Sequence, residues 1–300
     1  MQSVGRHTTR GQGVPGVIAR TLVHPDAVAA ATRFAGTVVR DFFWLQFSVK
    51  WGVRRVPIVA VDHPLDAGVP FAPDRIGAYL DFVAFWIRPL GYIGRRFGSE
   101  AQRRYTVEFL DLIERCYREA ADVYRARMST TRRPRYYRGR FLAIHLFDPH
   151  YLCVPSLHVM IVVLAYTFYR RAFAELGVTG EEAAALDAEL FDGAVEITET
   201  VLYIKQHSVN CIPAALYAMS RITPAEVTRA EVATFIDRLF LDAPLLADGA
   251  GEDIRAFSRD TFARLAADGA SDPEWTAPVR RLLDSLARDP GSGVPPAARP

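Results

Sequence analysis

Apolar side chains recur at steps of three and four residues along most of this chain of 300 residues. Between Glu100 and Arg127 the spacing is carried by Leu110, Ile113, Tyr117 and Ala121. Side chains at this spacing lie on one face of a helix, whereas a half-buried strand alternates apolar and polar residues, and few segments do so. The pattern predicts an all-α fold in which amphipathic helices pack into a bundle.

The same period predicts helices along the rest of the chain, separated by turns that contain proline. Arg133-Pro134 and Asp148-Pro149 are two of these turns. The other predicted helices are His24 to Val49, Ile76 to Ile93, Val159 to Leu176, Glu181 to Ile204, Pro213 to Ser220, Pro224 to Leu241, Gly251 to Ala267 and Trp275 to Arg288.

The two ends of the chain differ in composition from the middle. Residues 1–15 and 289–300 are rich in Gly and Pro, so we expect both ends to be disordered. The residues with candidate chemistry fall within 16–221, which we expect to form one helical core. Residues 222–288 show amphipathic helices without such chemistry and are predicted to form an accessory C-terminal part.

The longest apolar segment, Val159 to Tyr169, covers about half of the roughly 20 residues that a membrane-spanning helix needs. Arg170-Arg171 ends this segment, so we expect a buried core helix and no transmembrane helix. Residues 1–16 lack the apolar segment of a signal peptide. We therefore expect a cytoplasmic protein, with peripheral contact with a membrane surface left open.

Charge and cysteine content bear on partners and cofactors. The 36 basic and 34 acidic residues are interleaved and give a net charge of +2, which does not favour a nucleic-acid partner. The chain has no C-x-x-C pair, so its three cysteines are expected to be reduced and inert in the core. These are Cys116, Cys153 and Cys211. No cofactor is expected.

Reactive side chains gather in two short segments, Pro155-Ser156-Leu157-His158 and Lys205-Gln206-His207. Ser156 follows a proline and precedes an apolar helix, so it is predicted to be the N-cap, with His158 in the first turn. A hydroxyl, two imidazoles and an ammonium can surround a tetrahedral oxyanion, and an imidazole can carry a phosphoryl group. Phosphoryl transfer is therefore the leading hypothesis.

Basic side chains near these segments are candidate phosphate ligands. Lysine occurs only twice, at Lys50 and Lys205, and Lys205 stands two positions before a histidine. Its compact charge with three donors suits a phosphate oxygen, and the alternative is a solvated lysine at a helix end. The arginines before Pro134 either bind phosphate bidentately or form a solvated face. They include Arg125, Arg132 and Arg133.

In their order and spacing, Arg133-Pro134, Pro155-Ser156-Leu157-His158 and His207 resemble the three signature motifs of the type 2 phosphatidic acid phosphatase and vanadium haloperoxidase superfamily. Pro64 to Pro73 and Lys205-Gln206-His207 are similar to its lipid-phosphotransferase branch, which includes the inositol-phosphoceramide synthases. The resemblance covers roughly residues 62 to 221 and implies the helical bundle of that superfamily.

The resemblance implies a role for each matching residue. His207 would be the nucleophile that forms a phosphohistidine, and His158 would protonate the leaving oxygen. Ser156, Lys205 and Arg133 would hold the equatorial oxygens of the phosphoryl group. The substrate would be a phosphomonoester, either soluble or linked to a lipid.

Four positions depart from the family pattern. Thr200-Val201 stand where the third motif has Ser-Arg, and Ala126 where the first motif has lysine. Cys211 replaces the aspartate that would fix the tautomer of the nucleophilic histidine and stabilise its charged form. Asn210 beside it would either orient this ring by its carbonyl or serve as the N-cap of the helix that contains Pro213.

These departures leave three functions open. The first is a phosphohydrolase or phosphotransferase that acts through His207. The second is a catalytically impaired protein of the same fold that binds phosphate or a phospholipid headgroup without turnover, which Cys211 favours. The third is a zinc site formed by His158, His207 and Cys211, although these residues lack the compact spacing of a ligand motif.

Overall fold

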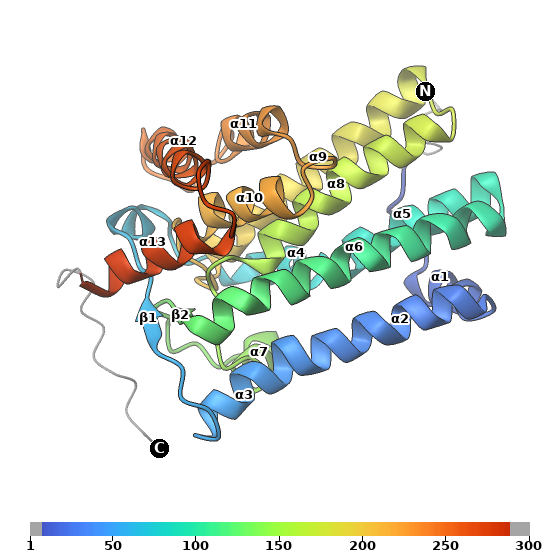
Figure 1. The fold of residues 1–300 in the computed structure, drawn as a ribbon. Coiled ribbons are helices and arrows are strands. Elements are labelled where there is room, and N and C mark those ends of the chain that lie inside the picture. Colours follow the sequence, from blue (N-terminus) through green and yellow to red (C-terminus); the bar gives the residue numbers. More distant parts are fainter. Residues whose placement is uncertain (1–7, 289–300) are drawn as a thin grey trace.

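The helix α8 (Leu157–Glu175) runs through the middle of the molecule and buries apolar side chains on nearly all of its sides. A helix that is apolar all round must be covered on every side. The computed structural model, which describes residues 8–288, packs four helices against it (Figure 1). These are α5 (Phe82–Phe97), α6 (Ser99–Ala126), α9 (Gly180–Tyr203) and α10 (Cys211–Ile222). The predicted all-α fold is confirmed.

By length and composition, α8 is the one helix in the described part of the chain that could cross a membrane. Within the bundle, however, 78% of its most apolar window is buried. The predicted apolar segment Val159 to Tyr169 is the middle of this longer helix of 19 residues, and its expected place in the core is confirmed.

A second layer of helices lies along α6 (Figure 1). The helix α2 (Pro25–Thr37) packs on α6 and continues through the π-helical segment η1 (Val38–Trp44) into α3 (Leu45–Lys50). The predicted helix from His24 to Val49 is therefore present as one nearly continuous helical stretch. Its apolar side chains meet those of α6 through Phe34 and Phe42, whose rings both contact Tyr117.

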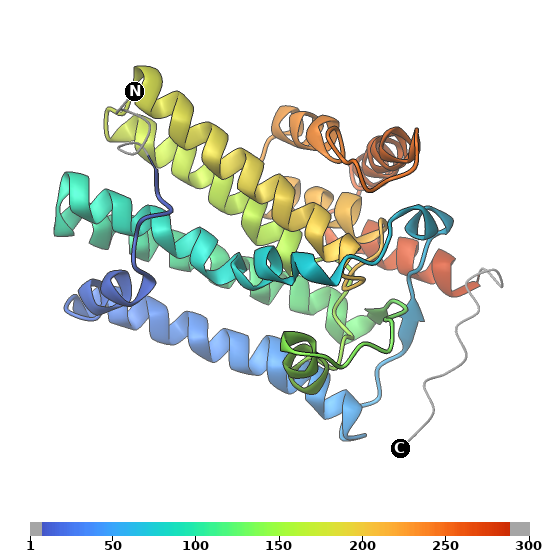
Figure 2. The same ribbon diagram turned by 180° about the vertical axis from the view of Figure 1, so that it is seen from behind.

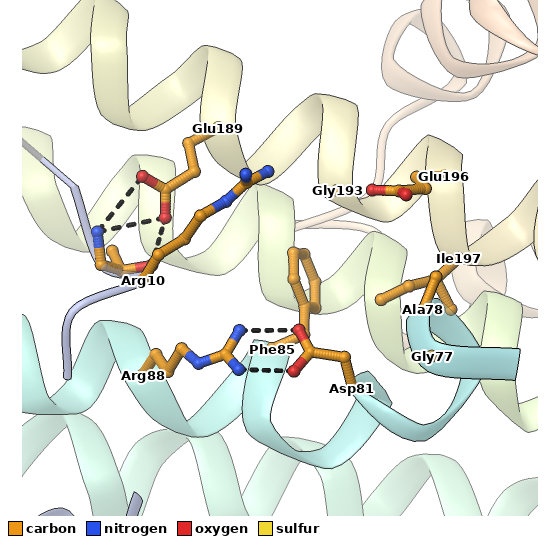
Figure 3. A pocket seen from close by; sticks show the side chains of 11 residues that line it. Arg10, Gly77, Ala78, Asp81, Phe85, Arg88, Glu189, Gly193, Glu196 and Ile197 are labelled. Carbon is orange, nitrogen blue, oxygen red and sulfur yellow. Dashed lines mark hydrogen bonds and ion pairs between the residues drawn. The ribbon is translucent and has the colours of Figure 1, made fainter. Parts of the chain in front are cut away.

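The first residues of the described chain are ordered, contrary to the prediction for residues 1–15. Thr8 and Thr9 each donate a hydroxyl hydrogen bond of 2.5 Å to the carboxylate of Glu189 on α9. Figure 3 shows this carboxylate beside the N-terminal segment. Residues Val14–Thr21 then form α1, which packs on α5. The prediction failed for residues 8–15 because it rested on Gly and Pro content and could not include a distant carboxylate. Residues 1–7 and 289–300 lie outside the described residues.

Short elements between the long helices were not predicted, because they are too short to show a period. Strand β1 (Ile58–Ala60) pairs in parallel with β2 (Met128–Thr130). The Oγ of Ser129 in β2 accepts a hydrogen bond of 2.7 Å from the backbone N–H of Val154. This pair of strands thereby fixes the loop that leads into α8. The other unpredicted short elements are η2 (Pro64–Gly68), η3 (Pro73–Arg75) and α7 (Arg140–Phe147). Helix α4 (Ile76–Leu80), in contrast, is the first part of the predicted helix from Ile76 to Ile93, which is interrupted at Asp81 and continues as α5.

The C-terminal helices pack directly on the rest of the bundle (Figure 1). They are α11 (Arg229–Arg238), α12 (Ala250–Asp268) and α13 (Thr276–Arg288). Helix α12 contacts α10, and α13 contacts α6 and β1. The predicted helix from Pro224 to Leu241 is shorter than expected because Thr228 caps α11, accepting a hydrogen bond of 3.2 Å from the backbone N–H of Glu231.

A core substitution provides a test of this packing. Phe109 on α6 is fully buried, and its ring lies 5.1 Å from that of Phe168 and 5.2 Å from that of Tyr169. We expect Phe109→Ala to lower the free energy of unfolding by about 4 kcal/mol, measured by urea denaturation, because it leaves a cavity. The matched control is Phe147→Ala, at a side chain that is 69% exposed, with an expected loss below about 1 kcal/mol. Equal losses would contradict the core described above.

Candidate active site

Ser156 and His207 meet at the N-terminus of α8. Ser156 is the N-cap, as predicted, and its Oγ accepts a hydrogen bond of 3.4 Å from the backbone N–H of Val159. The same Oγ lies 3.2 Å from Nε2 of His207, which follows α9 in the chain. Both side chains are buried. Two residues 51 positions apart therefore form one hydrogen-bonded pair.

The turn after α9 places His207. Lys205 adopts a left-handed backbone conformation with φ of 56°, which is uncommon for a residue other than glycine. This reverses the chain, so that the backbone N–H groups of Gln206 and His207 both donate to the carbonyl of Val201. The Lys205 ammonium donates to the carbonyl oxygens of Asp66, at 2.7 Å, and Val69. Burial lowers the pKa of Lys205, and the carboxylate of Asp66 acts against this shift.

The second imidazole of the site, that of His158, lies beside the ring of His207. Its ring stacks on Tyr79, with ring centres 4.8 Å apart, and lies 4.7 Å from the ring of Phe82. The rings of His158 and His207 are 5.6 Å apart, edge to face. Burial lowers the pKa of His158 to about 4, so the free protein holds this imidazole neutral at pH 7.

His207 is also held neutral. Burial lowers the pKa of His207 well below its ordinary value, and the positive charges that His158 and His150 would carry when protonated lower it further. Its Nδ1 is buried and has no hydrogen-bond partner among the described residues. Asn210 occupies the N-cap position of α10 without capping it, and its amide donates to the carbonyl of Val61 at 3.1 Å. The structure therefore shows Asn210 neither orienting the His207 ring nor capping the helix by its side chain.

Arg133 is anchored by side chains that the sequence did not single out. Its guanidinium donates to the Asp148 carboxylate, to the Asp148 carbonyl at 3.2 Å, and to the side-chain oxygen of Gln206. Its Nε is buried and has no partner in the described chain. Burial alone would raise the pKa of Asp148, but hydrogen bonds from His150 and the charge of Arg133 outweigh burial and hold this pKa far below its usual range.

Two cavities meet at His207. The larger one, of about 810 Å³, opens beside Arg132, Arg133 and Lys205. The smaller one, of about 30 Å³, lies on the side of His158. The larger cavity is also lined by Asp62, His63, Pro64, Asp66, Ala67, Phe71, Thr131, Pro134 and Leu286, and the smaller one by Phe42, Tyr79, Asp148, His150, Leu152, Cys153, Leu157 and Gln206. The lining of the larger cavity thus includes the His207 imidazole and three basic side chains.

One predicted phosphate ligand lies away from both cavities. Arg125 near the end of α6 binds Asp41 and Asp122, each at 2.6 Å, and so ties α6 to η1. The structure thus brings together Ser156, His158, Arg132, Arg133, Lys205 and His207, and leaves Arg125 and Asn210 without contact with the imidazoles.

Comparison of this chain with known protein families, curated proteins and solved structures finds no match. The geometry must therefore be judged on its own terms. Among residues 8–288, no group of three or more His, Cys, Asp or Glu side chains is placed to hold a metal ion. The zinc site considered for His158, His207 and Cys211 consequently has no geometric support. The Sγ of Cys211 instead accepts a hydrogen bond of 3.4 Å from the backbone N–H of Ser208.

A further cavity, of about 380 Å³, lies between α4, α5, α9 and the N-terminal segment (Figure 3). Asp81 and Arg88 form a bidentate ion pair on one side of it, and Glu189 holds Thr9 on the other. No imidazole or thiol of residues 8–288 lines this cavity. Asp81 and Arg88 are already bound to each other, and the cavity offers no nucleophile comparable to His207, so the cavities at His207 remain the candidate site.

Sequence reasoning missed Asp148, His150 and Gln206. The predicted turn at Asp148-Pro149 is present, since the backbone N–H of His150 donates to the Asp148 carboxylate at 3.0 Å. A turn motif, however, carries no sign that the other carboxylate oxygen binds Arg133. For Gln206, the only signal was its place between Lys205 and His207.

The buried imidazoles predict how stability depends on pH. Burial lowers the pKa of His150 to about 4, and the charge of Arg133 adds to this effect. As pH falls below about 6.5, His150 binds a proton in the unfolded chain but not in the folded protein. The free energy of unfolding therefore falls by up to about 1.4 kcal/mol per pH unit. We expect His150→Asn to remove this contribution between pH 6.5 and 4.5 in urea denaturation.

Asparagine is chosen because His150 has a φ of 67°, which asparagine tolerates. If the stability of the variant depends on pH as steeply as that of the wild type, His150 is not held neutral by burial.

Proposed function

We propose that this protein is a phosphohydrolase or phosphotransferase that acts on phosphomonoesters through a phosphohistidine at His207. The observation that carries the proposal is the Ser156 hydroxyl 3.2 Å from Nε2 of His207, with the His158 ring beside it. Arg132, Arg133 and Lys205 line the cavity that opens at the same imidazole. A nucleophile, a second imidazole for proton transfer and cationic donors are the groups that this reaction needs.

In the first step the neutral His207 ring is the nucleophile. Its low pKa leaves a nitrogen lone pair available at neutral pH. Nε2 attacks phosphorus, a P–N bond forms, and the P–O bond to the leaving group breaks. The leaving oxygen takes its proton from protonated His158. The products of this step are the free alcohol, phosphohistidine and neutral His158.

In the second step a water molecule attacks the phosphohistidine. Neutral His158 takes a proton from this water, the O–P bond forms, and the P–N bond breaks. Inorganic phosphate leaves, while His207 is neutral again and His158 is again protonated. An alcohol in place of water would give a new phosphomonoester, so the same step accounts for phosphotransfer.

Unpartnered polar atoms support an anion in the larger cavity. Buried polar groups are nearly always hydrogen-bonded, but Nε of Arg133 is buried without a partner in the described chain. If the side chains of Arg133 and Lys205 turned toward the cavity, a phosphate oxygen would accept from this N–H, while Ser156 and Lys205 would donate to others. Donors of this kind are each worth about 10² to 10³ in kcat when charge develops on the bound group.

A second function is favoured by how the cations are held. Arg133 is bound to Asp148 and Gln206, Lys205 donates to two carbonyl oxygens, and Nδ1 of His207 has no hydrogen-bond partner among the described residues. These contacts support a protein that binds phosphate or a phospholipid headgroup without turnover.

Under either function we place the protein in the cytoplasm, and the free, buried state of its three cysteines supports this.

The first test replaces the proposed nucleophile. We expect His207→Ala to abolish phosphate release from a panel of soluble and lipid phosphomonoesters, and vanadate to inhibit the wild type, because both remove the phosphohistidine route. The control is His24→Ala, at the start of α2 and outside both cavities at His207. Phosphate binding by the wild type without release of product would support the second function. Equal release by both variants would contradict the role of His207.

The second test uses pH and the leaving group. Because the pKa of free His158 is about 4, its protonated fraction falls as pH rises, so kcat/KM should fall about tenfold per pH unit between pH 5 and 7. His158→Ala should lower hydrolysis of an alkyl phosphate by about 10² to 10⁴. The same substitution should lower the rate of 4-nitrophenyl phosphate hydrolysis much less, since the 4-nitrophenolate leaving group needs no proton. An equal loss on both substrates would show that His158 is not the acid.

A further inference from the structure

Large hydrophobic side chains are exposed along three neighbouring segments. Eleven of the 17 exposed large hydrophobic side chains in the described chain lie within residues 39–53, 80–83 and 137–147. Trp51 is 62% exposed and Phe147 69% exposed. The full set is Val39, Phe43, Trp44, Trp51, Val53, Leu80, Val83, Tyr137, Leu142, Leu146 and Phe147. Such a concentration of exposed apolar side chains commonly marks an interaction site.

The three segments border one part of the surface. Phe42 of η1, Tyr79 of α4 and Asp148 at the end of α7 line the same small cavity, so the elements that carry the exposed side chains converge there. Figure 2 shows α4 and α7 in front, with the continuation of α2 through η1 and α3 below them. We call this surface, with the eleven side chains above and the basic side chains described next, the aromatic-basic face.

Positive charge is concentrated on and beside the first and third of these segments. Residues 38–58 and 131–147 contain nine of the 36 basic residues of the chain and one of its 34 acidic residues, Asp41. The rest of the chain is therefore acidic, with 27 basic and 33 acidic residues. Six of the nine basic side chains are exposed and form no ion pair with any described residue: Lys50, Arg54, Arg55, Arg135, Arg138 and Arg140. Asp41 is buried and bound by two arginines, so it does not offset this charge.

We propose that the aromatic-basic face binds the surface of an anionic lipid bilayer. Exposed Trp, Tyr, Phe and Leu side chains enter the boundary between headgroups and acyl chains, while Lys and Arg meet the anionic headgroups. This inference goes beyond the proposed function and does not depend on it, because a protein without phosphatase activity could bind a bilayer by the same face.

Charge favours a bilayer over a second copy of the chain. In a two-fold dimer the same face would contact itself, and six unpaired cations would oppose six others. A bilayer that contains phosphatidylserine offers apolar depth for Trp44 and Trp51 and negative charge for the cations together. An anionic bilayer therefore accommodates both the exposed aromatic side chains and the unpaired basic side chains of this face.

The test is sedimentation of the full chain with sucrose-loaded vesicles. We expect binding to vesicles of 70% phosphatidylcholine and 30% phosphatidylserine, weaker binding to phosphatidylcholine alone, and release by 0.5 M NaCl. Each basic side chain contributes about fivefold to the partition coefficient, so the triple variant Arg54→Gln, Arg55→Gln, Arg138→Gln should bind about 100-fold more weakly.

A matched control removes three exposed arginines elsewhere: Arg10→Gln, Arg95→Gln and Arg229→Gln. None of these lies on the aromatic-basic face, so this variant should bind like the wild type. A separate variant, Trp44→Ser with Trp51→Ser, should bind at least about tenfold more weakly and lose the blue shift of tryptophan fluorescence that vesicles cause in the wild type. Circular dichroism of each variant would verify that it is folded.

Three outcomes would overturn the proposal. The first is absence of binding to anionic vesicles, and the second is an equal loss of binding in the control variant. The third is dimerisation in place of vesicle binding. Sedimentation velocity would then show a concentration-dependent dimer that the Trp44 and Trp51 substitutions abolish, and the face would be assigned to self-association. Vesicle binding with no phosphate release would support this proposal and contradict catalysis, so the two can fail separately.

Discussion

Burial of α8 on all of its sides is the constraint on which the other elements depend. Because its apolar surface has no single face, one neighbouring helix cannot cover it, and α5, α6, α9 and α10 are all required. The same burial fixes where α8 begins. Ser156 at that end is fully buried, so its hydroxyl must find partners inside the protein, and these are a backbone N–H group of α8 and the ring of His207. Packing thus determines where reactive groups can meet.

The helices and the N-cap were predictable because their signals are local. A period of three to four residues predicts α6, and a serine between proline and an apolar stretch predicts the cap at Ser156. The bonds that complete the candidate site are not local: Arg133 binds Asp148, and Glu189 orders Thr8 and Thr9. No periodicity encodes such contacts, so the sequence predicted which residue types could react but not which of them are tied to other groups.

Removal of water is the common cause of the electrostatics at the two cavities. It lowers the pKa of His150 and His158 to about 4, that of His207 well below its ordinary value, and that of Lys205. The site therefore holds its three imidazoles in their neutral form. A bound anion would reverse part of this effect, because its negative charge favours the protonated imidazoles. Substrate binding and proton uptake should be coupled for this reason.

The contacts of Arg133 have a consequence for selectivity. Its Nη1 and Nη2 groups are already bound by Asp148 and Gln206, so any anion that takes the place of these partners competes with an internal ligand at high effective concentration. Singly charged, weakly basic anions such as chloride or acetate offer too little in exchange, whereas a dianion with several oxygens offers more bonds than it displaces. Asp148 and Gln206 would thus raise the affinity that an anion needs in order to bind Arg133. Abundant small anions would be excluded from the cavity by this competition, without any steric barrier.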